Sequence, residues 1–87
     1  MPIYNLTLSW TQLGRQQKGL KLKRRQDALN VFVTRQINGA DISLVSLTPR
    51  DADDDAAIWV VQGSPGDVTN LINEWTGHNR VTVTGGP

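Results

Sequence analysis

The first ten residues alternate between apolar and polar side chains. The apolar positions are Tyr4, Leu6, Leu8 and Trp10, and the polar positions between them are Asn5, Thr7 and Ser9. Successive side chains of an extended chain point to opposite faces, so a period of two is typical of a strand with one buried face. The pattern therefore predicts an N-terminal strand that covers a core on one side only.

Residues 58–76 predict a strand followed by a helix. The run Ile58–Val61 is short, apolar and rich in β-branched residues, which is typical of a strand. Ser64 stands where an N-cap belongs, Pro65 follows at the first helical position, and Asp67 is placed to complete a capping box. The apolar positions of the helix recur at i, i+3, i+4 and i+7, at Val68, Leu71, Ile72 and Trp75. One stripe of this kind predicts an amphipathic helix.

A turn and a last strand are predicted to follow this helix. We expect Gly77 to end it as a left-handed C′ residue, a conformation that glycine adopts without strain. Residues 80–84 then alternate between polar and apolar side chains, as in a half-buried strand.

Residues 23–39 allow two interpretations. As a hairpin, the β-rich run Val31–Thr34 enters a type I′ turn at Asn38-Gly39, and propensity favours this because Val, Phe, Thr and Asn are weak helix formers. As a helix, the segment has Gly39 as its C′ stop and a single apolar stripe of Ala28, Leu29, Phe32, Val33 and Ile37. The order of residue types from 27 to 32 and at Gly39 also repeats that of 67–72 and Gly77. This repeat leads us to prefer the helix.

A further strand is predicted over Ile42–Leu47, ended by Thr48-Pro49. The order becomes strand, helix, strand, strand, helix, strand, which is that of a ferredoxin-like α+β two-layer sandwich. If 23–39 is a hairpin instead, the alternative is a five-stranded, mostly antiparallel sheet with one helix at 65–76. At 87 residues we expect one small domain spanning 1–87.

The composition excludes several kinds of functional site but says little about the cellular compartment of the protein. The chain has no cysteine, so disulfides, thiolate nucleophiles and zinc knuckles are excluded. No apolar run approaches the length of a membrane span, and the N-terminus lacks the pattern of a signal peptide. We therefore expect a soluble protein and, by default, a cytoplasmic one without membrane contact.

The net charge of +1 hides two segments of opposite charge. Four of the eight acidic residues lie within 51–55, and we expect them to form a solvated connection, because the spacing lacks the glycine and distal glutamate of a calcium loop. Residues 11–22 read as a long loop without a clear period. Six of the nine basic residues gather in or beside this loop, at Arg15, Lys18, Lys21, Lys23, Arg24 and Arg25.

Catalytic motifs are missing from the sequence. His78 is the single histidine, and we expect it to be an exposed turn residue beside a helix end, where a cation is favoured. Gly63–Asp67 could bind phosphate at a helix N-terminus, but Pro65 removes a donor and Asp67 repels anions. We expect no metal and no cofactor, and an enzyme is the less favoured reading.

The basic segment 15–25 is the favoured contact surface. Clustered cations suit the phosphates of a nucleic acid, and an acidic protein is the other partner we consider. Ferredoxin-like RNA binders also stack bases on exposed aromatic side chains, for which Trp59 is the one candidate. The sequence therefore predicts a non-catalytic binding or regulatory module that forms a homodimer through its edge strands.

Two other functions remain open. One is a small cofactor-independent dimeric α+β-barrel enzyme that uses Trp75, His78 and Arg80 beside a pocket. The other is a structural or assembly subunit of a larger particle, in which the basic and acidic segments pair between copies.

Overall fold

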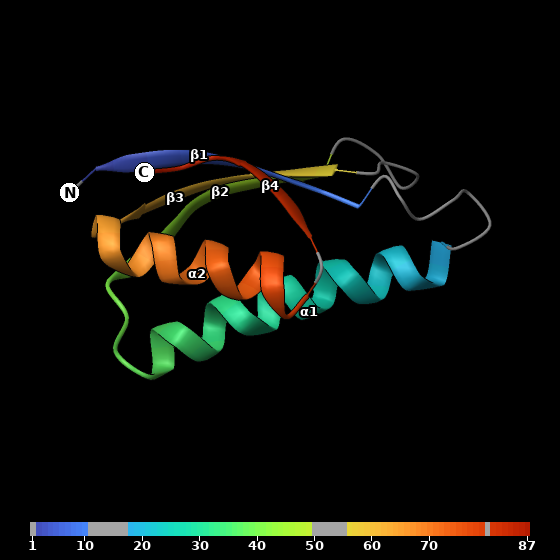
Figure 1. The fold of residues 1–87 in the computed structure, drawn as a ribbon, viewed down its shortest axis with the longest axis horizontal. Helices are drawn as coiled ribbons and strands as arrows, with labels where there is room; N and C mark the ends of the chain where they lie inside the picture. The colour runs from blue at the N-terminus through green and yellow to red at the C-terminus, as the bar shows by residue number, and fades with distance from the viewer. Residues whose placement is uncertain (1, 11–17, 50–55, 80) are drawn as a thin grey trace.

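The computed structural model describes residues 2–10, 18–49, 56–79 and 81–87, and within them the protein is a small α+β domain. Figure 1 shows a sheet with both helices on the same side of it. The elements in chain order are β1 (Ile3–Ser9), α1 (Lys18–Ile37), β2 (Ile42–Pro49), β3 (Ala56–Gly63), α2 (Pro65–Gly77) and β4 (Thr82–Gly85).

The sheet has four strands in the order β2-β3-β1-β4, and all three pairings are antiparallel. Leu6 of β1 lies opposite Trp59 of β3, so both side chains point to the helices. The strand predicted at the N-terminus is confirmed, because Leu6, Leu8 and Trp10 are buried while Asn5 is exposed.

The helical interpretation of the middle segment is correct and the five-stranded alternative is wrong. α1 begins at Lys18, so the loop expected over 11–22 is also wrong for residues 18–22. Ala28 and Phe32 bury their side chains against the sheet, and this packing outweighs the β propensity of Val31–Thr34. Gly39 ends the helix with φ 92°. The amide of Gly39 donates to the carbonyl of Gln36 and that of Ala40 to Arg35, as in a Schellman motif.

The start of α2 is confirmed, with one change. Ser64 is the N-cap and accepts the Asp67 amide. The Asp67 carboxylate does not return to the Ser64 amide as in a capping box; it accepts the Ser64 hydroxyl and the backbone N–H of Asp41. The Ser64 amide instead donates to the carbonyl of Asp41. The cap therefore also fastens the α1–β2 connection.

The expected end of α2 is wrong. Gly77 is the last residue of the helix and has no positive φ. His78 takes the C-cap position in right-handed backbone geometry, and the amides of His78 and Asn79 both donate to the carbonyl of Glu74. A left-handed glycine is unnecessary because these bonds use the carbonyl of Glu74 and the amide of Val81 donates to that of Trp75.

The core lies between the helices and the sheet. Trp59 is at its centre, with ring centroids 5.3 Å from Phe32 and 5.0 Å from Trp75. Trp59, the one candidate for base stacking, is therefore not available for that role. The helices cover its face of β3, and Ile58 and Val60 lie on the other face. In the part of the chain that the structure describes, neither helix is long and apolar enough to cross a membrane.

Candidate anion-binding groove between the two helices

The structure describes only three of the six basic side chains of the predicted contact surface. Arg15 lies outside the described residues, and the side chains of Lys18 and Lys21 are not described although their backbone belongs to α1. Lys23 is exposed, and Arg24 and Arg25 are half-buried. The described basic residues thus belong to the first turns of a helix and not to a loop.

Arg24 connects the two helices. Its Nη1 donates to the backbone carbonyl of Asn79 at 2.6 Å, just beyond the C-terminal end of α2. A cation is favoured there because the last carbonyls of a helix carry partial negative charge. Arg24 therefore has a structural role that its position in a basic run did not suggest.

Arg25 packs toward the sheet. Its guanidinium carbon lies 5.6 Å from the ring centroid of Trp10, within the range of a cation–π contact. Both side chains line a small cavity of about 70 Å³, completed by Ala28, Leu47, Ala57 and Trp59. The Trp10 indole N–H is buried there and has no hydrogen-bond partner among the described residues. A few water molecules would fit this space.

Lys23 and Arg24 share a larger groove with His78. Its volume is about 410 Å³, and it lies between the first half of α1 and the end of α2. The complete lining is Lys23, Arg24, Asp27, Asn30, Val31, His78 and Asn79. Asn79 is only 7% exposed, and its Oδ1 has no hydrogen-bond partner in the part of the chain that the structure describes. No local sequence signal connects His78 with residues 23 and 24, because only the packing of α1 on α2 brings them together.

The groove combines an excess of cations with amide groups. Lys23 and Arg24 are basic, Asp27 is acidic, and His78 adds an imidazole ring that can donate a hydrogen bond. A lysine and a guanidinium side by side suit phosphate or carboxylate oxygens. Among the residues that the structure describes, no group of acidic and histidine side chains could hold a metal ion.

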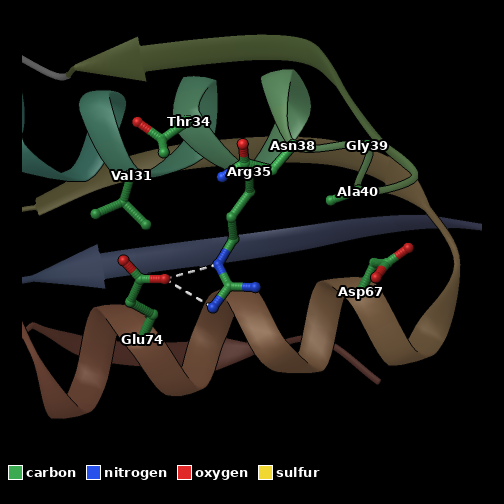
Figure 2. Close-up of a pocket in the computed structure, with 8 residues that line it drawn as sticks. All are labelled: Val31, Thr34, Arg35, Asn38, Gly39, Ala40, Asp67 and Glu74. Atoms are coloured by element: carbon green, nitrogen blue, oxygen red, sulfur yellow. Dashed lines mark hydrogen bonds and ion pairs between the residues drawn. The ribbon is translucent and has the colours of Figure 1, made fainter.

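A second hollow lies further along the same helix–helix seam (Figure 2). Its volume is about 430 Å³. Here the charges are paired: Arg35 Nε and Nη2 both contact Glu74 Oε1, at 2.8 and 2.7 Å. The amide of Asp41 and the hydroxyl of Ser64 donate to Asp67 and lower the pKa of its carboxyl, with a further contribution from Arg35. Because its arginine is already paired with a carboxylate, this hollow is a weaker candidate for anion binding than the groove of Lys23 and Arg24.

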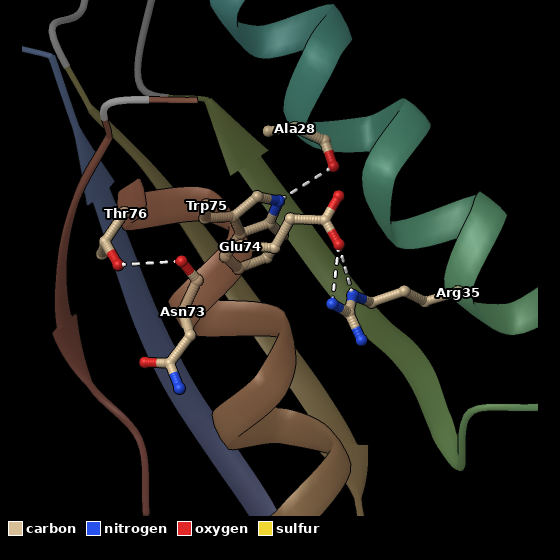
Figure 3. Close-up of polar contacts among 6 residues, drawn as sticks. All are labelled: Ala28, Arg35, Asn73, Glu74, Trp75 and Thr76. Carbon is tan, nitrogen blue, oxygen red and sulfur yellow. Dashed lines mark hydrogen bonds and ion pairs between the residues drawn. The ribbon is translucent and has the colours of Figure 1, made fainter. Parts of the chain in front are cut away.

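The aromatic member of the alternative catalytic group is not at the groove. Trp75 is fully buried, and its Nε1 donates to the carbonyl of Ala28 at 3.1 Å (Figure 3). Its ring therefore serves the core, while His78 lies at the surface. Arg80 is outside the described residues, as are the four aspartates at 51–55.

Comparison with known proteins gives no match: no family model, curated protein or solved structure is similar enough to this chain to count. Functional inference therefore rests on the fold and the groove.

Proposed function

We propose that this chain is a non-catalytic binding or regulatory module that contacts nucleic-acid phosphates through the first half of α1. One observation carries the proposal: α1 has no acidic residue in its first turn, and the basic residues that follow lead into the groove of Lys23, Arg24 and His78. The positive end of the α1 dipole lies at the first turn, beside Lys18 and Lys21, and adds to the attraction for anions there.

The structural bond of Arg24 leaves room for a ligand. A guanidinium carries five N–H donors, and the bond to Asn79 uses Nη1. Lys23 is exposed, so its ammonium can reach a phosphate without disturbing the fold. Arg15, Lys18 and Lys21 would extend the same basic surface.

The sheet supports contact with the phosphate backbone over base recognition. Trp10 and Trp59 are both buried beneath the helices, and the described residues of the open face include no aromatic side chain. Base stacking on the sheet, as in many RNA binders, would have no platform there. We therefore expect weak sequence preference and strong salt dependence.

Two structural proposals accompany this function. We propose a ferredoxin-like arrangement, supported by the βαββαβ order and by a strand order that reads β4-β1-β3-β2 from the other edge. We also propose that the chain forms a homodimer, because the edge strands of so small a sheet leave backbone groups unpaired.

The test is salt-dependent binding to heparin and to a fluorescent single-stranded oligonucleotide. Replacing Lys18, Lys21 and Lys23 by methionine removes charge without touching the Arg24 bond. We expect the affinity at low salt to fall about tenfold or more and the salt slope to become shallower by roughly two units, near 0.7 per phosphate contact.

The control is Arg35→Gln, at the other end of α1, which we expect to bind like the wild type. Unchanged heparin retention in the triple-lysine variant would contradict the proposal. Binding to poly-glutamate but not to the oligonucleotide would instead identify an acidic protein partner.

A further inference from the structure

The exposed apolar side chains gather on one flank of the molecule, formed by α1 and β2. Seven large apolar side chains of the described residues are exposed, and only Ile3 lies elsewhere. The other six are Leu22, Val33 and Ile37 on α1 and Leu44, Val45 and Leu47 on β2, with exposed fractions from 37% to 78%. Scattered exposed apolar residues are ordinary, whereas a contiguous group marks a contact surface.

The geometry of α1 explains why its three residues lie on the side of β2. Arg24 and Arg35 both reach α2, so they mark the α2 side of the helix. At about 3.6 residues per turn, Leu22 and Val33 fall on the opposite side. Gln36 of α1 donates to the carbonyl of Ile42 in β2, which places this side of the helix above the edge of the sheet.

β2 is an edge strand that has no charged residue. It spans eight residues, Ile42–Pro49. Edge strands are commonly blunted by charges, by short length, by proline or by bulges, and the opposite edge, β4, has only four residues. In β2 the two such features are a register shift between Leu44 and Ser46 and the terminal Pro49, and the pairing with β3 is regular on both sides of the shift.

We infer that this flank, Leu22, Val33 and Ile37 with β2, binds a second copy of the chain across a twofold axis beside Val45. An antiparallel edge is self-complementary under such an axis, so β2 would pair with β2 into a sheet of eight strands and α1 would pack on α1. Because the two α1 helices run antiparallel, their basic first turns lie at opposite ends of the dimer and do not repel each other.

The available area fits a dimer of moderate affinity. β2 is about 26 Å long at about 3.3 Å per residue, and the shorter dimensions of the Cα trace are 20 and 17 Å. Two copies would bury on the order of 1,000 Å² in total, close to the lower limit of specific interfaces. This dimer is independent of phosphate binding, since Lys23 and Arg24 lie outside the flank.

Sedimentation equilibrium of the full chain tests the inference. We expect a monomer–dimer equilibrium with Kd of about 1–100 µM, and Val45→Lys to weaken it at least tenfold because a buried charge is unpaired. Ile37→Lys, on the helix surface, should act in the same direction and serves if Val45→Lys does not fold. The matched control is Ile3→Lys, which has a similar exposed fraction (56% against 53% for Val45) and should leave Kd unchanged.

A wild type that stays monomeric at about 1 mM would overturn the inference and leave the flank for a different protein. Equal weakening by Ile3→Lys would also overturn it, because the contact would then lie elsewhere. Geometry is tested by Val45→Cys in this cysteine-free chain, since residues beside the axis come within disulfide range. We expect a cross-linked dimer from Val45→Cys and none from Ile3→Cys; a wild type that dimerises while Val45→Cys stays unlinked would exclude β2–β2 pairing.

Discussion

The two helices lie on the same side of the sheet, yet different interactions hold them in place. α2 buries Val68, Leu71 and Trp75 completely. α1 is longer, but among its described side chains only Ala28 and Phe32 are buried, while Leu29 and Val31 pack partly against the core. Polar contacts add to its attachment. These contacts are the Arg24 bond to Asn79, the Arg25 contact with Trp10, the Arg35–Glu74 ion pair and the Trp75 bond to Ala28.

This difference suggests that α2 mainly builds the core and that α1 mainly carries the proposed binding surfaces. α2 uses its apolar stripe and its caps to build the core, so few of its groups remain for a partner. α1 rests on the core through one narrow stripe. Its other sides carry the basic first turns and the apolar flank, and both surfaces proposed for binding are therefore on α1.

The largest expected effect on the free energy of unfolding comes from a leucine-to-alanine substitution, which we compare between the two helices. Leu71→Ala should lower the free energy of unfolding by about 2–5 kcal/mol, because a fully buried leucine leaves a cavity. Leu22→Ala should change it by no more than about 0.5 kcal/mol, since Leu22 is 60% exposed. Urea unfolding at a protein concentration below the dimer Kd measures both. Equal losses would show that α1 is anchored as firmly as α2.

A smaller effect is expected for the ion pair that joins the helices. A double-mutant cycle of Arg35→Met and Glu74→Gln should give a coupling of about 0.2–1 kcal/mol, because both side chains are about one-third exposed. Added salt should reduce the coupling. A coupling of zero at low salt would mean that apolar packing alone holds this end of α1.

The smallest effect is confined to acid pH. The pKa of Asp67 is lowered from its ordinary value of 3.8 by the Asp41 amide and the Ser64 hydroxyl. The ionised carboxylate therefore stabilises the fold above pH 3.8, and this contribution is lost as the pH falls through the lowered pKa. Asp67→Ala should be less stable at neutral pH, and its difference from the wild type should shrink below pH 3.8. Thermal unfolding across this range measures it, and a constant difference would exclude the carboxylate as the cause.

Local sequence signals were sufficient for α2 and for β1. Ser64, Pro65 and the stripe through Trp75 act within one or two helical turns, so their effect does not depend on distant residues. The same reasoning failed at Gly77, because the carbonyl of Glu74 can be used by His78 and Asn79 without a left-handed residue. It also left Trp59 as a candidate for the open face, because alternation separates the two faces of a strand but does not say which face the helices cover.

The candidate groove was likewise predicted only in part from local sequence signals. The sequence identified the basic run and identified His78 as a residue beside a helix end, but it treated residues 18–22 as a loop and did not connect the two sites. Arg24 and His78 line one groove because α1 crosses the end of α2, a contact between residues 54 positions apart that leaves no periodic signal.

By itself, then, the sequence determined the strand–helix unit of β3 and α2 with the N-cap of α2, the apolar face of β1 and the concentration of positive charge, because each depends on neighbours along the chain. Only the tertiary structure decided that residues 18–37 are a helix, that Arg24 fastens the end of α2 and that Trp59 is the centre of the core. It also decided that the exposed apolar residues of α1 and β2 share one flank. These features depend on which surfaces pack together, and the free energy that selects them is gained only when distant segments meet.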